Sequence, residues 1–236
     1  MKLPRIAAAE ALGTALLLAA VVGSGIMAER LSGGNVAVAL LANTMATGAI
    51  LVVLILAFQS ISGAQFNPAV TLFLCLRGDV PWRHLPVLVA VQVAGGIGGV
   101  LLAHAMFGES IWQFGLRDRS TGGEILSEAV AAFGLILTIG LVGRARPAAI
   151  PYAVAGYISA AYWFTASTSF ANPAAAIARS FTASFASIAP GHVPAFVIAE
   201  ISGALVGTLV LGWFLRETDA AQALAGARRS SRSSSG

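Results

Sequence analysis

Charge is scarce in this sequence: only 10% of its 236 residues are Asp, Glu, Lys or Arg, whereas 57% are hydrophobic. A soluble globular domain usually carries about 25% charged residues. So few charges cannot cover a surface that faces water, which excludes a soluble globular protein. The composition suits the hydrocarbon of a bilayer, so lipid is an expected partner and the net charge of +4 does not indicate nucleic-acid binding.

Cysteine is almost absent, because Cys75 is the only one, and this excludes an intrachain disulfide bond. We interpret Cys75 as a small apolar residue inside a helix. The glutamates show no spacing that suits shared acid–base work, so the chain is not expected to be an enzyme. No metal and no other cofactor is expected.

Long apolar runs, by contrast, are abundant, and each is long enough for the roughly 20 helical residues that cross a bilayer. The first run exceeds the core of a signal peptide, so we interpret it as an uncleaved span. The six predicted spans are approximately Ile6–Ala28, Val36–Phe58, Leu85–Phe107, Ile125–Gly143, Pro147–Phe170 and Val193–Leu215.

Basic residues predict the orientation of these spans. With the N-terminus inside, ten basic residues fall on the inner side and four on the outer side, as the positive-inside rule favours. Both termini are then cytoplasmic. The outer four are Arg30, Arg117, Arg119 and Arg179. The Ser- and Arg-rich tail, residues 217–236, is predicted to be a disordered cytoplasmic segment.

The chain also repeats itself. "VAVQVAGGIGGV" (Val89–Val100) matches "VIAEISGALVGT" (Val197–Thr208), and Glu10 in the first span matches Glu128 in the fourth. Each half holds three spans, an odd number, so the second half must enter the membrane upside down. The sequence therefore predicts one transmembrane domain over residues 1–216, with repeat one at about 6–107 and repeat two at about 125–215.

Two short Asn-Pro-Ala segments occupy matched places in the repeats. Each precedes an apolar run that is too short to cross a membrane. Asn is a preferred N-cap and Pro is favoured at the first helical position, so each segment begins a helix. The two segments are Asn67, Pro68, Ala69 and Asn172, Pro173, Ala174.

The inverted repeat makes these two short helices start near the midplane and point in opposite directions. The predicted fold is therefore an all-α membrane protein with six transmembrane helices plus two re-entrant half-helices in an inverted 3+3 repeat. Each helix N-terminus carries about half a positive charge, so two facing N-termini repel cations and protons. The asparagine amides are left to bind a neutral solute.

"ISGAQFNPAVTL" and "FANPAAAIARSF" resemble the major intrinsic proteins, the aquaporins and aquaglyceroporins, and the resemblance covers about Ile6 to Leu215. It implies a homotetramer with one pore per subunit, and bacterial members of this kind suggest the inner membrane. Glu10 and Glu128 match glutamates that brace the re-entrant loops. Gln65 stands at an inner-pore position where many members carry His.

The resemblance also assigns the outer constriction to four positions, which here are Thr47, Ala160, Ser169 and Ala175. Water-selective members place an aromatic, a His, a small residue and an Arg there, whereas glycerol-conducting members keep the Arg with two aromatics and a Gly. Four small residues without Arg predict a wide constriction. Bacterial branches that lack this Arg resemble those associated with arsenic resistance, which suggests neutral arsenicals.

Arg179 lies four residues beyond Ala175, about one helical turn further outward. It could guard the outer mouth in place of the missing Arg, or it could be a solvated or salt-bridged residue at a helix end. Both interpretations stay open at the level of sequence.

The predicted function is a passive channel for small neutral solutes: glycerol-like polyols, metalloid hydroxides such as arsenite, and water. One alternative is a water-selective aquaporin. A second is an ion-coupled secondary transporter, because inverted repeats also build those proteins. A third is a membrane structural protein with a closed pore.

Overall fold

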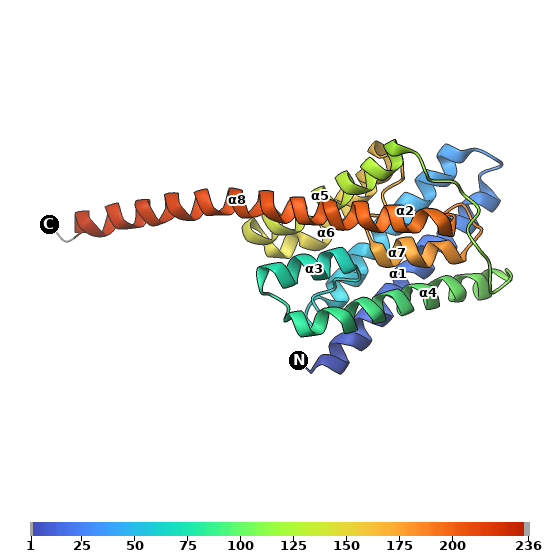
Figure 1. The fold of residues 1–236 in the computed structure, drawn as a ribbon, viewed down its shortest axis with the longest axis horizontal. Coiled ribbons are helices and arrows are strands. Elements are labelled where there is room, and N and C mark those ends of the chain that lie inside the picture. The colour runs from blue at the N-terminus through green and yellow to red at the C-terminus, as the bar shows by residue number, and fades with distance from the viewer. Residues whose placement is uncertain (1, 234–236) are drawn as a thin grey trace.

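The computed structural model describes the backbone of residues 2–233 and the side chains of residues 2–216. Within this range the chain forms eight α-helices and four short 3-10 turns, without strands (Figure 1). The α-helices are α1 Leu3–Leu31, α2 Val36–Phe58, α3 Pro68–Arg77, α4 Leu85–Phe107, α5 Gly122–Ala145, α6 Ile150–Phe164, α7 Pro173–Ala178 and α8 Val193–Ser233.

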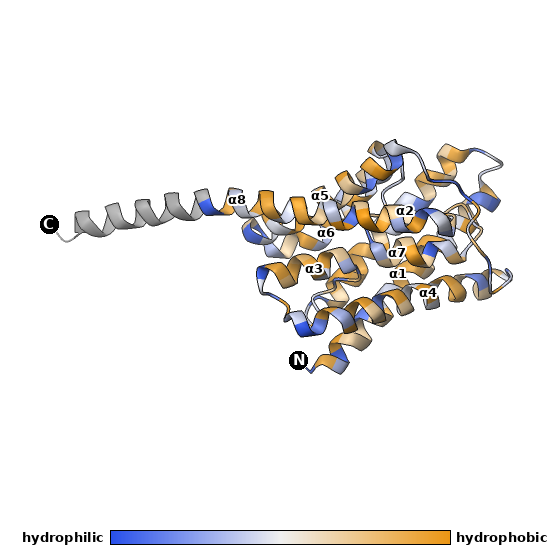
Figure 2. Cartoon of the chain, viewed as in Figure 1, coloured by the Kyte–Doolittle hydropathy of each residue, from blue (hydrophilic) through white to orange (hydrophobic). Residues whose placement is uncertain are grey.

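Five of the described helices, α1, α2, α4, α5 and α8, are long and apolar enough to cross a membrane. Figure 2 shows hydrophobic residues along these helices and hydrophilic residues at their ends and in the connections. The sixth span, α6, has 15 residues and continues a 3-10 turn at Pro147–Ala149. The predicted span Pro147–Phe170 is therefore too long: its helix ends at Phe164, and the chain continues as a loop.

The N-terminus and the outgoing part of α8 lie at the same end of the bundle (Figure 1). We call this the proximal end, and we call the opposite end, which carries the α4–α5 connection at residues 108–121, the distal end. An even number of crossings places both termini on one side, which agrees with six spans.

Helix pairing follows the repeat, since α1 packs on α4 and α5 packs on α8. Glycines allow the close approach. A Cβ on Gly95 would lie 2.3 Å from the backbone oxygen of Ala11, and a Cβ on Gly203 would lie 2.0 Å from that of Ala129. These matched positions exclude any side chain, because packed helices meet there through their backbones.

The backbone of residues 217–233 continues α8 as a helix, whereas the composition of the tail predicts disorder. Ala, Gln, Leu and Arg have high helix propensity, and the helix that precedes them removes the cost of nucleation. Residues 234–236 lie outside the described range. Cys75 is buried on α3, as predicted.

Candidate solute pore

The two half-helices begin at the Asn-Pro-Ala segments, as the cap chemistry predicts. Asn67 caps α3, and its side-chain oxygen accepts from the Ala69 amide at 2.9 Å. Asn172 caps α7, and its side-chain oxygen accepts from Ala174 and Ala175 at 3.0 and 3.3 Å. Proline occupies the first helical position in both.

Each asparagine also ties its half-helix to the other repeat. Asn67 Nδ2 donates to the Ala171 carbonyl at 2.7 Å, and Asn172 Nδ2 donates to the Phe66 carbonyl at 2.9 Å. An amide NH2 has two hydrogens, so this cross-pairing leaves one on each asparagine. The two helix N-termini therefore meet, and both caps keep a donor for another partner.

The segments before the caps have left-handed backbone conformations. Phe66 and Ala171, each one residue before its asparagine, have φ of 49°, and Ala64 and Ser169, each three residues before, have φ of 50° and 48°. Such conformations cost about 1–3 kcal/mol each in residues other than glycine, so the surroundings must hold them.

Glu10 and Glu128 supply much of that support. Glu10 accepts from the amides of Gln65 at 3.0 Å and Phe66 at 2.6 Å, and Glu128 accepts from those of Phe170 at 2.9 Å and Ala171 at 2.7 Å. Both carboxyl groups are fully buried. The donors stand one and two residues before the cap in both repeats, which matches the loop-bracing role that the family resemblance assigns.

A second buried residue in each repeat supports the re-entrant loop beside the glutamate, and we call each such pair a brace. In repeat one, Gln92 on α4 donates from Nε2 to Glu10 at 2.9 Å and to the Thr71 hydroxyl at 2.9 Å. In repeat two, the matched residue on α8 is Glu200, which accepts from the Asn172 amide at 2.9 Å. Repeat two therefore has a second acid, Glu200, beside Glu128, where repeat one has an amide beside Glu10.

A cavity of about 330 Å³ runs past the two caps. Its proximal part is lined by Gln59, Gly63 and Gln65, its middle by both asparagines, and its distal part by Thr47 and Arg179. Gln65 is buried, and its side-chain oxygen receives no hydrogen bond, so it is available to a solute. The remaining wall is largely aliphatic.

Three of the four predicted constriction residues, Thr47, Ser169 and Ala175, line the distal part of this cavity. The fourth prediction was wrong: Ala160 is exposed on α6 and does not line the cavity. The pore face of α6 is a stripe at four-residue spacing, formed by Ile150, Val154, Ile158 and Tyr162. Ala160 lies two residues off this stripe, which turns it away from the pore.

Tyr162 is therefore a pore residue that counting along the sequence missed. Its hydroxyl lies 3.2 Å from the Thr47 hydroxyl, across the cavity wall between α6 and α2. The four-residue spacing of α6 could have identified it.

Arg179 also lines the cavity, so the prediction of a constriction without Arg or any large side chain was wrong. Arg179 is 3% exposed, its Nε donates to the Ala186 carbonyl, and its guanidinium lies 3.3 Å from the centroid of the Phe170 ring. This excludes the solvated helix-end interpretation. α7 ends at Ala178, and a 3-10 turn carries Arg179 to the pore.

A second buried arginine, which sequence reasoning had only counted as an outer charge, braces the same loop. Arg119 donates to the carbonyls of Ser167 at 2.6 Å and Ser187 at 3.0 Å, and its guanidinium lies 4.9 Å from the Phe170 ring. Burial, followed by the charges of Arg179 and Arg117, lowers the pKa of Arg119 to about 9. It still carries its charge at neutral pH. No motif marks it in the sequence.

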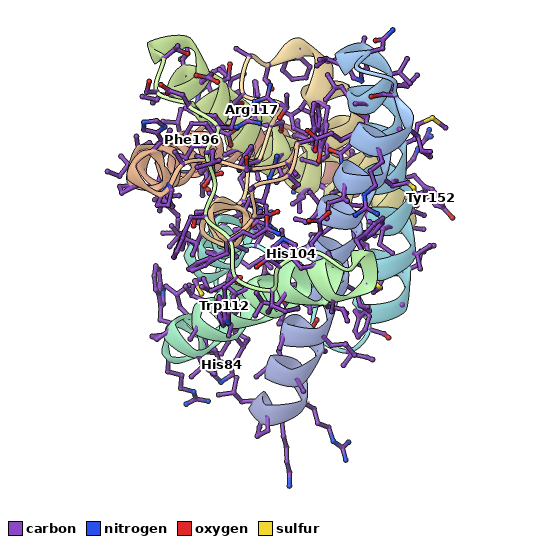
Figure 3. All side chains as sticks on the ribbon, turned by 90° about the vertical axis from the view of Figure 1, so that its right-hand side faces the viewer. His84, His104, Trp112, Arg117, Tyr152 and Phe196 are labelled. Atoms are coloured by element: carbon purple, nitrogen blue, oxygen red, sulfur yellow. The ribbon has the colours of Figure 1, made fainter. Side chains whose placement is uncertain are left out.

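The distal end around this loop is densely bonded. Figure 3 looks onto that end, with Trp112 and Arg117 of the α4–α5 connection labelled. His104 on α4 is buried, and its ring nitrogens lie 2.9 Å from the Ile111 carbonyl and 2.9 Å from the Thr182 hydroxyl. It therefore joins α4 to two distal connections.

Six spans, two capped half-helices that meet inside the bundle and a cavity past the caps define a membrane channel protein with an inverted repeat. A family model described as Major intrinsic protein matches residues 1–146. The chain therefore belongs to the major intrinsic protein family, whose members are channels and not enzymes.

Individual relatives agree with this assignment. The chain is 53% identical over 214 residues to the aquaglyceroporin AqpS of Rhizobium meliloti (strain 1021), with 91% of each chain covered. It is 31% identical over 99 residues to the glycerol uptake facilitator protein of Bacillus subtilis, which covers 37% of this chain and 36% of that protein.

The fold is similar to that of the aquaglyceroporin from Plasmodium falciparum, known from its X-ray structure. The TM-score is 0.67, and the likeness covers 88% of this chain and 95% of that one. At 18% sequence identity it concerns the fold alone.

Proposed function

We propose that the chain conducts small neutral solutes passively, with polyols of the size of glycerol as its main substrates and with water and neutral metalloid hydroxides such as arsenite as further ones. The observation that carries this proposal is the cavity of about 330 Å³ that passes both asparagine caps. A solute inside it meets hydrogen-bonding groups at the caps and aliphatic groups elsewhere.

This mixed lining favours a polyol. Gln65, Asn67 and Asn172 offer donors and acceptors in the proximal and middle parts, while the stripe on α6 contributes three aliphatic residues. A molecule with hydroxyls along one edge and carbon along the other can satisfy both sides at once. A strongly hydrated ion cannot, because the aliphatic wall does not replace its water.

The charge distribution supports passive conduction of neutral solutes and disfavours ion coupling. Among the described residues that line the cavity, Arg179 is the single charged one. The N-termini of α3 and α7 add positive potential at the caps. Cations and protons are thus repelled at two levels, and no acidic residue in the lining offers a site for a coupling ion.

The distal constriction supports glycerol over water alone. Arg179 lies there with the Tyr162 side chain, and small residues, Thr47 and Ala175, leave space beside them. Glycerol-conducting members of the family also place an Arg beside aromatic residues at this level. The water-selective alternative would require a closer ring of side chains, including a His.

Relatives named aquaglyceroporin and glycerol uptake facilitator support the same substrate class. We further propose the family's homotetramer, a location in the bacterial inner membrane and cytoplasmic termini. Under this orientation the proximal end is cytoplasmic and the distal end, with Arg119 and Arg179, is external.

The test is a stopped-flow comparison of water, glycerol, urea and arsenite flux into proteoliposomes that contain the purified protein. Glycerol flux should rise linearly with the gradient and should not respond to a proton or sodium gradient. Saturation with coupling would establish a transporter instead. Water flux without glycerol flux would establish a water-selective channel, and the absence of all flux would favour a closed structural protein.

The role of Arg179 as a gate residue is tested by Arg179→Ala in the same assay, with Arg30→Ala as the control, since Arg30 is an exposed arginine at the same end. Arg179→Ala should change the ratio of glycerol to water flux by about ten-fold, because the constriction loses its cation and widens. A ratio of glycerol to water flux equal to that of the Arg30→Ala control would contradict the gate role of Arg179.

A further inference from the structure

The braces of the two re-entrant loops use the same positions but different chemistry. In repeat one, the Glu10 carboxylate faces the Gln92 amide, which donates a hydrogen bond to it. In repeat two, Glu128 accepts from the Ala171 amide and Glu200 accepts from the next amide along the chain, that of Asn172, so the two carboxyl groups lie next to each other. Two acceptors thus stand where the other repeat has a donor and an acceptor.

Both acids of repeat two are fully buried, so water cannot relieve the contact. Two ionised carboxylates in contact repel each other strongly in a low-dielectric interior. Glu128 cannot be the acid with the proton without cost, because both of its oxygens already accept backbone hydrogen bonds, from Phe170 and Ala171.

Only one of the two carboxyl oxygens of Glu200 accepts a hydrogen bond. Its Oε1 accepts from the Asn172 amide, whereas its Oε2 is buried and has no hydrogen-bond partner. In repeat one the hydroxyl of Thr71 bonds the matched Gln92. The residue matched to Thr71, four after the cap, is Ala176 in repeat two, so no hydroxyl is supplied there.

The charged groups around the pair complete the picture. Arg179 is close enough to act electrostatically on both Glu128 and Glu200, and Arg119 acts on Glu128 from the α4–α5 connection. Among the described residues no ion pair joins either arginine to these acids. One proton on the pair leaves a single negative charge, which the nearby Arg179 balances.

We propose that Glu200 is a positioning residue that works as a neutral carboxylic acid: its Oε2–H donates to the Glu128 carboxylate while its Oε1 holds the Asn172 amide. In this form it does for repeat two what the Gln92 amide does for repeat one. The proton on Glu200 thus binds Glu200 to Glu128, and Glu200 in turn holds the amide of the second cap, Asn172.

The direct test is infrared spectroscopy of the full-length protein in an ester-free detergent at neutral pH. A protonated carboxyl has a C=O stretch that ionised carboxylates lack, and exposed Asp and Glu are ionised at this pH. The wild type should show such a band, and Glu200→Gln should remove it. Gln92→Glu should add a second band, because it creates the same pair in repeat one. These signals do not depend on which solute the channel conducts.

Glycerol flux in proteoliposomes gives the second readout. Glu200→Gln should keep flux within about two-fold of the wild type, whereas Glu200→Ala should lower it about ten-fold, because the Asn172 amide loses its acceptor. Glu128→Gln should also lower it about ten-fold, since an amide cannot accept from both Phe170 and Ala171.

A wild-type protein without the carboxyl band would overturn the proposal, as would a band that survives Glu200→Gln. If Glu200→Gln folds but loses flux as Glu200→Ala does, the carboxylic acid has no amide-like role and the proposal is also wrong. Size-exclusion chromatography of each variant separates these results from failure to fold.

Discussion

The first re-entrant half is a regular helix, and the second is not. α3 runs for ten residues, ends at a left-handed Gly78 and sends Arg77 to the proximal surface, where it pairs with Asp79 at 3.0 Å. α7 runs for six residues and tightens into a 3-10 turn that carries Arg179 into the pore. Matched caps therefore lead to opposite placements of the arginine that follows.

The hydrogen bonds that hold the two re-entrant loops also differ between the repeats. Glu10 collects four donors, from Ser62, Gln65, Phe66 and Gln92. Glu128 collects two backbone donors and faces another acid, and its loop gains support instead from Arg119. Repeat one thus resembles a fixed support, whereas repeat two contributes Tyr162, Ala175 and Arg179 to the distal part of the cavity. The two inverted repeats thus share a scaffold, and they differ in the side chains that support each loop and line the cavity.

The largest effect is expected where repeat two narrows the pore. Ala175→Phe should abolish glycerol flux, because a ring added beside Tyr162 and Arg179 closes the constriction. Ala160→Phe is the matched control on the exposed side of α6, away from the cavity, and should leave flux unchanged. Stopped-flow assays measure both, and loss of flux in the Ala160 variant would restore that residue to the constriction.

The two braces should differ in their contribution to stability. Glu10→Ala should cost about 4 kcal/mol, and Glu128→Ala about 3 kcal/mol for its two backbone donors and the proposed Glu200 hydroxyl, at about 1 kcal/mol for each buried donor left without its partner. Thermal unfolding in detergent compares them. Equal losses of thermal stability would mean that the second repeat is as rigidly braced as the first.

The helix contacts should respond equally in both repeats. Gly95→Ala and Gly203→Ala should each cost about 1–3 kcal/mol, because the new methyl group would overlap a backbone oxygen. Gly98→Ala is the control, since a Cβ there meets nothing within 4 Å. It should be neutral or slightly stabilising in the same thermal assay, and a cost equal to that of Gly95→Ala would show that helix contact is not the cause.

The smallest effect is expected at the end of the first half-helix. Arg77→Ala should change stability by about 0–1 kcal/mol, because its ion pair with Asp79 is exposed. Arg119→Ala should cost more, since two carbonyls and the Phe170 ring lose a buried partner. The difference is read from the same unfolding curves. An equal loss of stability in both variants would mean that the buried Arg119 contributes no more than the exposed Arg77.

Much of the fold could be predicted because it follows from local rules. Apolar length predicts spans, and α2 and α4 have the predicted boundaries. Asn followed by Pro predicts a helix start, and α3 and α7 begin at Pro68 and Pro173. Prediction failed at α6, where an apolar loop follows an apolar helix and hydropathy does not separate them.

The constriction could be predicted only in part for a similar reason. Ser169 and Ala175 lie within three residues of the cap, whereas Thr47 and Ala160 were both placed by counting back across the loop before a cap, and only Thr47 falls on the pore face of its helix. One residue along a helix rotates a side chain by about 100°, so two residues separate a pore face from a lipid face. Arg119 comes from a distant connection and had no local signal.

Composition, hydropathy and the two caps were sufficient to establish a membrane channel with an inverted repeat, because each depends on neighbours along the chain. Three-dimensional packing alone decided that Arg179 faces the pore, that the Tyr162 hydroxyl meets that of Thr47 and that Glu200 meets Glu128. Those contacts join residues up to 115 apart in the sequence or depend on where a short helix ends, and the linear order of residues does not encode either.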